Sequence, residues 1–99
     1  MFEFLVETYL SPETSGSLAA AAGEAALAAA RVSEQGAEVR LLRVIFLPAD
    51  EVCFYLYESA TAEAVGEAVR RARLRCDRIG EAVSIRSAEA GLGRPTRPT

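Results

Sequence analysis

The order in which strand-like and helix-like segments follow one another constrains this chain more than any other feature. Four segments favour β-strands, because apolar and polar residues alternate or because β-branched and aromatic residues dominate: 2–9, 39–47, 52–58 and 78–85. Two segments favour helices: one from Ser15 to about Gln35, and one that begins after Ser59 or Thr61, where either hydroxyl can cap the first turn. The expected order is therefore strand, helix, strand, strand, helix, strand.

Each expected helix has one apolar face. Nine of the twelve residues from Ala19 to Ala30 are alanine, which has the highest helix propensity, and Gly36 suits the position after the helix end. The spacing of apolar residues by three and four predicts which side of each helix is buried. The two stripes are Leu18, Ala22, Ala25, Ala29 and Val32 in the first helix and Ala62, Val65, Val69 and Ala72 in the second.

The turn-forming residues Pro48 to Glu51 separate the two middle strands, which should therefore form a hairpin. Two right-handed strand–helix–strand units joined by this hairpin give an α+β fold of ferredoxin-like order, βαββαβ, with a four-stranded antiparallel sheet and both helices on one face. The alternative is an open sheet that a partner chain completes. With 99 residues there is room for one domain, expected over 1–86. Residues 87–99 have no apolar period and should form a flexible C-terminal tail.

Composition excludes several functions. The chain contains no histidine, so it cannot supply a Ser-His-Asp triad, a Cys-His pair or a His-ligated metal site. A net charge of −3 gives no reason to expect nucleic acid, and no window is long and apolar enough for a membrane span. The first residues lack the basic region of a signal peptide, so we expect a cytoplasmic protein. There Cys53 and Cys76, which form no CxxC motif, should be free thiols.

The strand patterns predict which residues the helices cover. The covered side should hold Phe2, Phe4, Val6, Leu42, Val44, Phe46, Phe54 and Leu56. The open side should then hold Glu3, Leu5, Glu7, Tyr9, Leu41, Arg43, Ile45, Cys53, Tyr55, Tyr57, Glu81 and Val83. This second set is too apolar to face water alone, and such patches mark interfaces or ligand sites. We therefore expect a homodimer through the sheet face.

The polar members of the open side are the candidate ligand-binding residues: Glu7, Arg43, Cys53, Tyr55, Tyr57 and Glu81. A carboxylate that a dimer partner shields can act as a general base. A tyrosine could orient an oxygen, and Arg43 could bind an acidic group. The structural alternative is that the charged residues form ion pairs, that Cys53 is a small core residue and that the tyrosines only pack.

Five arginines gather between the second helix and the last strand: Arg70, Arg71, Arg73, Arg75 and Arg78. They could meet phosphate. Positive charge also interacts favourably with the dipole at a helix C-terminus. We interpret the cluster as a solvated helix end.

Four segments resemble a known family: FLVETYL (Phe4–Leu10), VRLLRV (Val39–Val44), CFYLYESATAEAVGEAVRRA (Cys53–Ala72) and DRIGEAVSI (Asp77–Ile85). They are similar to small bacterial ferredoxin-like proteins of unknown function, often labelled nickel-binding-protein-like, over about residues 2–86. The resemblance implies this fold in a dimeric α/β-barrel arrangement, and it suggests nickel as a cofactor. Nickel favours imidazole ligands, which this chain lacks, so no metal ligand is assigned.

Three functions remain open. The leading hypothesis is a small dimeric binding module that holds a small molecule or a metal on the open sheet face. The second is a cofactor-free acid/base enzyme, like an oxygenase or isomerase, with Glu7 or Glu81 as base and Tyr55 or Arg43 as partner; this rests on fold analogy alone. The third is a structural or regulatory interaction protein without chemistry. A non-enzymatic role is favoured.

Overall fold

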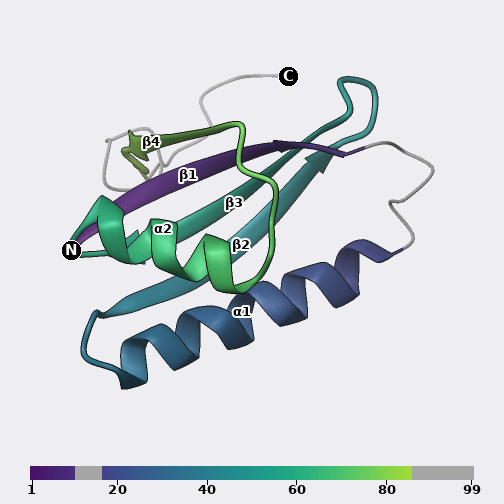
Figure 1. Ribbon diagram of the computed structural model, residues 1–99. Helices are drawn as coiled ribbons and strands as arrows, with labels where there is room; N and C mark the ends of the chain where they lie inside the picture. Colours follow the sequence, from purple (N-terminus) through teal and green to yellow (C-terminus); the bar gives the residue numbers. More distant parts are fainter. Residues whose placement is uncertain (11–16, 86–99) are drawn as a thin grey trace.

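The computed structural model describes residues 1–10 and 17–85 of the chain. Within them the elements follow one another in the expected order (Figure 1). They are β1 (Phe2–Tyr9), α1 (Leu18–Glu34), β2 (Val39–Leu47), β3 (Val52–Ser59), α2 (Ala62–Arg71) and β4 (Arg78–Ala82). The predicted cap at Ser15 and the predicted flexible tail 87–99 lie outside the described residues.

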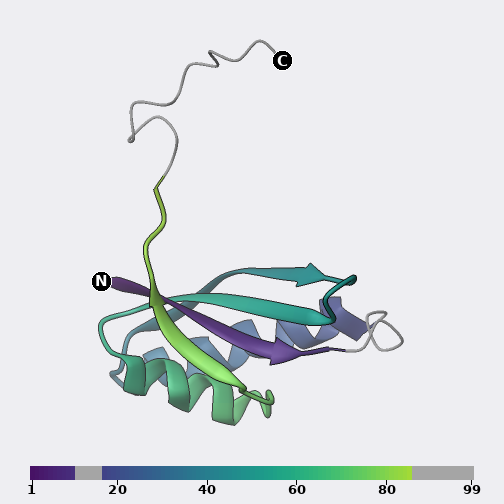
Figure 2. The ribbon, with the colours of Figure 1, turned by 90° about the horizontal axis from the view of Figure 1, so that it is seen from above.

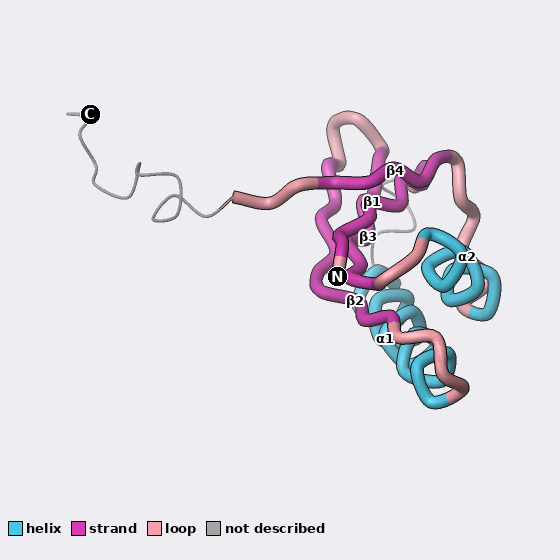
Figure 3. The backbone as a smooth tube through the Cα atoms, turned by 90° about the vertical axis from the view of Figure 1, so that its left-hand side faces the viewer, coloured by secondary structure: helices cyan, strands magenta, loops and turns pink. Residues whose placement is uncertain are grey.

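The four strands form one antiparallel sheet in the order β2-β3-β1-β4. Both helices lie on one face of this sheet, and none of the described residues covers the other face (Figures 2 and 3). The predicted α+β ferredoxin-like fold is confirmed. All four strands come from one chain, so the sheet needs no strand from a partner.

Local sequence explains where the helices begin and end. The Thr61 hydroxyl accepts a hydrogen bond from the backbone N–H of Ala64 at 3.1 Å and caps α2, as predicted. After α1, Gly36 has φ = 106°, a left-handed conformation that glycine adopts without steric cost. Two serines fix the start of β2: Ser33 bonds both backbone groups of Val39, at 2.7 and 2.9 Å, and Ser59 donates to the Glu38 carbonyl at 2.7 Å.

The core lies between the sheet and the helices. Its largest fully buried side chains include Tyr57, Val6, Val39 and Val65. The helices contribute alanines and valines, and the buried ones are Ala25, Ala28, Ala29, Val32, Ala64, Val65, Ala68 and Val69. The predicted stripes are confirmed in part: Ala28, Ala64 and Ala68 were not among them, and Ala62 is exposed. Because alanine side chains are short, the space between the layers must be filled by large residues from the sheet.

This need for volume reverses the predicted faces of β3. Tyr57 lies directly opposite Phe4, and Tyr55 lies directly opposite Val6, so both tyrosines share the covered face. Cys53, Tyr55 and Tyr57 are buried under the helices, and their exposed fractions do not exceed 3%. The intervening residues of β3, which were expected on the covered side, lie on the open face; they are Phe54 and Leu56.

Two further placements differ from the predicted ones. The β2–β3 register shifts between Leu41 and Arg43, so one extra residue is inserted there as a β-bulge. Leu41 therefore joins the core and Leu42 turns to the open face, the reverse of the expectation. In β4, Glu81 lies opposite Phe4 and thus belongs to the helix side of the sheet, where it stays exposed at the edge strand.

No helix within the described residues is long and apolar enough to cross a membrane.

Candidate functional site

The face of the sheet opposite the helices is the candidate site. The strand registers place its side chains in three rows that run from β2 across β3 and β1 to β4. These rows are Ile45–Phe54–Glu7–Arg78, Arg43–Leu56–Leu5–Gly80 and Arg40–Glu58–Glu3–Ala82. A fourth row, Leu47–Val52–Tyr9, crosses only β2, β3 and β1. Apolar side chains therefore occupy the middle of the face and extend to its Leu47 end, and charged residues lie toward the other end. We call the residues of these four rows together with Leu42 the open face.

Two adjoining hollows indent the open face. The larger has a volume of about 490 Å³ and lies over β2, β3 and β1, where Leu42, Ile45 and Leu56 are its apolar walls and Arg43 is its basic one. The smaller has a volume of about 290 Å³ and is lined by Glu7, among other residues. It lies beside Gly80, at which an added Cβ would meet no atom within 4 Å. The hollows share Leu5 and Ala82, so they lie side by side, and we call the two together the depression.

The charged groups of the open face differ in whether they are already paired. Arg40 and Glu58 form an ion pair at 2.9 Å, and Glu3 accepts a hydrogen bond from Ser84. By contrast, the side chains of Glu7, Arg43 and Arg78 form no hydrogen bond or ion pair with any residue that the structure describes. With Glu81, which borders the smaller hollow from the edge strand, two acidic and two basic groups without a described partner are available at the depression.

Only some of the predicted site residues meet there. Glu7 and Arg43 lie on the open face as predicted, and Glu81 borders the smaller hollow from the edge strand. The other three candidates, Cys53, Tyr55 and Tyr57, lie together on the opposite side of the sheet. Sequence reasoning did not single out Arg78 and Gly80 as site residues, although the register of β4 against Glu7 and Leu5 brings them to the depression.

The displaced candidates form a buried cluster of two phenols and a thiol. Burial raises the pKa of the Cys53 thiol, and a hydrogen bond with Tyr55 partly opposes this. Burial, together with the charge and the hydrogen bond of Cys53, raises the pKa of Tyr55 to about 12. Burial also raises the pKa of Tyr57. These groups stay protonated at neutral pH and belong to the core.

The side chains that could act as metal ligands do not suit nickel. Imidazole is absent from the chain, and no cluster of three or more Cys, Asp or Glu side chains within the described ranges could hold a metal ion. The thiol of Cys53 is buried and held protonated, whereas metals bind the thiolate. Cys76 is exposed, on the loop before β4.

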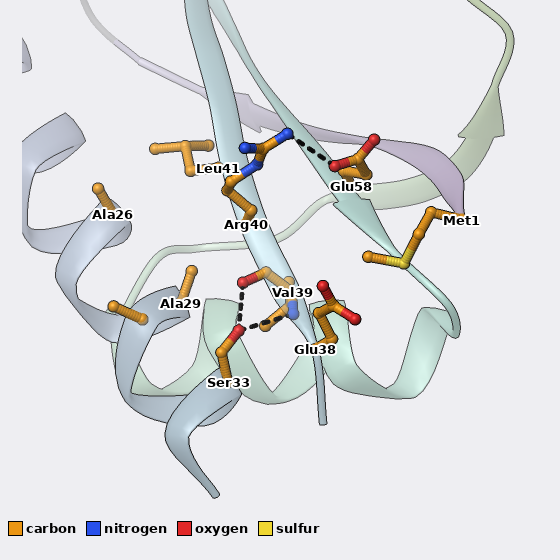
Figure 4. Close-up of a pocket in the computed structure, with 10 residues that line it drawn as sticks. Met1, Ala26, Ala29, Ser33, Glu38, Val39, Arg40, Leu41 and Glu58 are labelled. Carbon is orange, nitrogen blue, oxygen red and sulfur yellow. Dashed lines mark hydrogen bonds and ion pairs between the residues drawn. The ribbon is translucent and has the colours of Figure 1, made fainter. Parts of the chain in front are cut away.

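A groove of about 540 Å³ runs between α1 and β2 at the side of the molecule (Figure 4). The hydrogen bonds between Ser33 and Val39 lie at its lower end, and Arg40 and Glu58, which also line it, form an ion pair with each other. Its floor is alanine, including Ala26 and Ala29. Because Ser33, Arg40 and Glu58 already bind one another or the backbone, this groove has fewer unpaired polar groups for a ligand than the open face.

The fold and the indented open face define an α+β module of ferredoxin-like order. No protein-family model and no curated protein matches the chain. Among solved structures, the chain is similar to SCO4226 from Streptomyces coelicolor A3(2), with a TM-score of 0.66 and 27% sequence identity. The likeness covers 84% of this chain and 99% of SCO4226. It therefore extends over nearly all of that solved chain.

Proposed function

We propose that this protein is a small binding module that dimerises through the open face and holds a small organic molecule in the depression there. The observation that carries the proposal is the apolar middle of the open face. Ile45 and Leu47 are 42% and 40% exposed, and Phe54, Leu5 and Leu56 lie beside them without helix cover. The core on the other side already stabilises the monomer, and no element among residues 1–10 and 17–85 packs over this apolar surface.

The size of the sheet supports a dimer with a filled depression. The sheet has three strands of eight or nine residues and one of five, which together cover roughly 480 Å² per copy. Two copies would bury about 1,000 Å², which is near the lower limit for a stable interface. A molecule enclosed in the depression would add contact area to both copies. The free Glu7, Arg43 and Arg78 side chains favour an occupant that has both donor and acceptor groups.

Native mass spectrometry of untagged protein, purified without chelators, tests this proposal. We expect a dimer that carries extra mass, and the mass identifies the occupant. If the protein is a dimer that carries no extra mass, even after incubation with a metabolite extract, only the role of an interaction protein without a ligand remains. A monomer would overturn the proposed interface.

Gly80→Val provides a sharper test, because the new side chain would enter the smaller hollow where no atom lies within 4 Å of the Cβ. We expect the variant to fold and to lose the extra mass. Gly66→Ala is the matched control, since it adds a methyl group on α2 in equally open space, away from the sheet. If both variants keep the occupant, the depression is not where it binds.

The acid/base alternative now depends on Glu7, because Tyr55 and Glu81 do not share its face. Glu7 lies on the open face opposite Arg78 and borders the smaller hollow. Once an occupant is known, Glu7→Gln should weaken its binding and should abolish any turnover even at saturating occupant, since the amide cannot accept a proton. Equal turnover in the variant would rule out this base.

A further inference from the structure

A second groove lies in the helix layer, between α1 and the end of α2, on the side of the molecule away from the open face. Its volume is about 560 Å³, within the usual range for small-molecule sites. Four arginines line it, three of them from the sequence cluster and one, Arg31, from the last turn of α1. The other groups that matter here are Glu24 and Leu27. We call this the arginine groove.

The arginines of this groove fall into two pairs with different surroundings. Arg70 and Arg71 both bind Glu67, and Arg71 also donates to the Gln35 side chain at 2.7 Å. These contacts hold the Arg71 guanidinium in place. The side chains of Arg31 and Arg73, in contrast, form no hydrogen bond or ion pair with any described residue. Two unpaired guanidinium groups thus reach the groove from two different elements.

The local charge is opposite to that of the whole chain. Counting Glu24 and Glu67 against the four arginines leaves an excess of positive charge, although the chain carries −3 overall. The carbonyl end of the α2 dipole opposes part of this excess. The remainder still attracts an anion, because the half-charge of a helix end is smaller than that of two unpaired guanidinium groups.

The backbone at Arg73 is also unusual. Arg73 follows the α2 end with φ = 60°, a conformation that favours glycine, and its N–H and that of Leu74 bond the Arg70 and Val69 carbonyls. Arginine is therefore not the residue that this helix end prefers. Its presence here adds a charge to the groove at a cost in backbone conformation.

We propose that the arginine groove binds a small molecule that carries two or more phosphates beside a planar or apolar group. Guanidinium groups bind phosphate through two parallel hydrogen bonds and stack on planar rings. Arg31 and Arg73 hold the phosphates from opposite walls of the groove. Leu27, which is 54% exposed, and Ala28 form the apolar surface for the remainder of the ligand.

Calorimetric titration with ADP and with inorganic pyrophosphate at low salt tests the proposal. We expect ADP to bind, and to bind at least about fivefold tighter than pyrophosphate, because only ADP has a planar group. Equal affinities would overturn the apolar half of the proposal and assign the groove to inorganic polyphosphate. Absence of heat with both probes would overturn it entirely.

Three variants locate the binding. Arg31→Gln and Arg73→Gly should each weaken ADP binding about tenfold or more, since each removes one phosphate contact. Glycine suits the backbone at position 73, so Arg73→Gly should stay folded. Arg75→Gln is the matched control: it removes the same charge, but Arg75 pairs with Asp77 outside the groove at 3.1 Å. An equal loss in this control would mean that diffuse charge, and not the groove, attracts the nucleotide.

Discussion

Phe54 and Tyr55 are consecutive residues of β3, yet they lie in opposite environments. Tyr55 is 3% exposed beneath the helices, whereas Phe54 lines the smaller hollow of the open face. Tyr55 therefore contributes to the folding of one chain, whereas Phe54 belongs to the surface that we propose as the interface between two chains.

Glutamate at these two positions should therefore have different effects. Phe54→Glu should leave the monomer folded and abolish self-association, because a charge on the open face cannot be buried against a second copy. Tyr55→Glu should destabilise the monomer by about 4 kcal/mol or more, since it buries an unpaired charge in the core. Circular dichroism and light scattering after gel filtration measure the two effects. A stable dimer of Phe54→Glu would contradict the proposed interface.

The hydroxyl of Tyr57 is buried and has no hydrogen-bond partner among the described residues. Tyr57→Phe should therefore stabilise the protein by about 1 kcal/mol, because a buried unpaired hydroxyl carries a desolvation cost. Tyr55→Phe is the matched control and should destabilise by about 1 kcal/mol, since it loses the hydrogen bond with Cys53. Urea unfolding of both variants gives the values, and destabilisation by Tyr57→Phe would show that the hydroxyl is paired.

The stability of the fold should decrease in alkaline solution. The folded-state pKa values of Cys53 and Tyr55 lie above their ordinary values of 9.0 and 10.0, so the unfolded chain loses these protons first. The stabilising contribution is complete below about pH 9 and is lost as the pH rises toward the folded pKa of Tyr55, about 12. Urea midpoints between pH 7 and 11.5 should show this decline. The decline above pH 10 should be shallower in Tyr55→Phe.

The two thiols should react at very different rates. Cys76 is exposed, while Cys53 is fully buried with a raised pKa, and only the thiolate attacks a disulfide reagent. An aromatic disulfide reagent at pH 8 should consume one thiol per native chain and two per unfolded chain. Cys76→Ser should show none in the native state. Rapid reaction of both thiols in native protein would contradict the burial of Cys53.

The element order was predictable because each segment carries a strong local pattern. The alanine run of α1, the cap at Thr61 and the turn after Leu47 each depend on a few neighbouring residues. The order of the strands then followed from short connections and the handedness of crossovers. Local chemistry was therefore sufficient for the architecture.

The site was less predictable because both faces of β3 are apolar. Cys53, Tyr55 and Tyr57 alternate with Phe54 and Leu56, and neither set is polar enough to be assigned to the solvent-exposed face. The choice depends on volume: the alanines of the helices require the larger phenol side chains opposite them. No local pattern contains that information.

The β-bulge after Leu41 could not be predicted from the sequence for a similar reason. Two adjacent leucines show no difference in polarity, so nothing marks the residue at which the strand changes face. The arginine groove depends on tertiary packing as well, since Arg31 lies far from Arg73 in the sequence. The sequence cluster contained three of its four arginines but not the fourth.

The concentration of the core on one side of the sheet has a consequence for how such a protein can evolve. Substitutions in the four rows of the open face change the surface without disturbing the packing under the helices. Descendants of this chain can therefore acquire new specificities at little risk to folding. The same separation makes the open face a suitable starting point for designed binding sites.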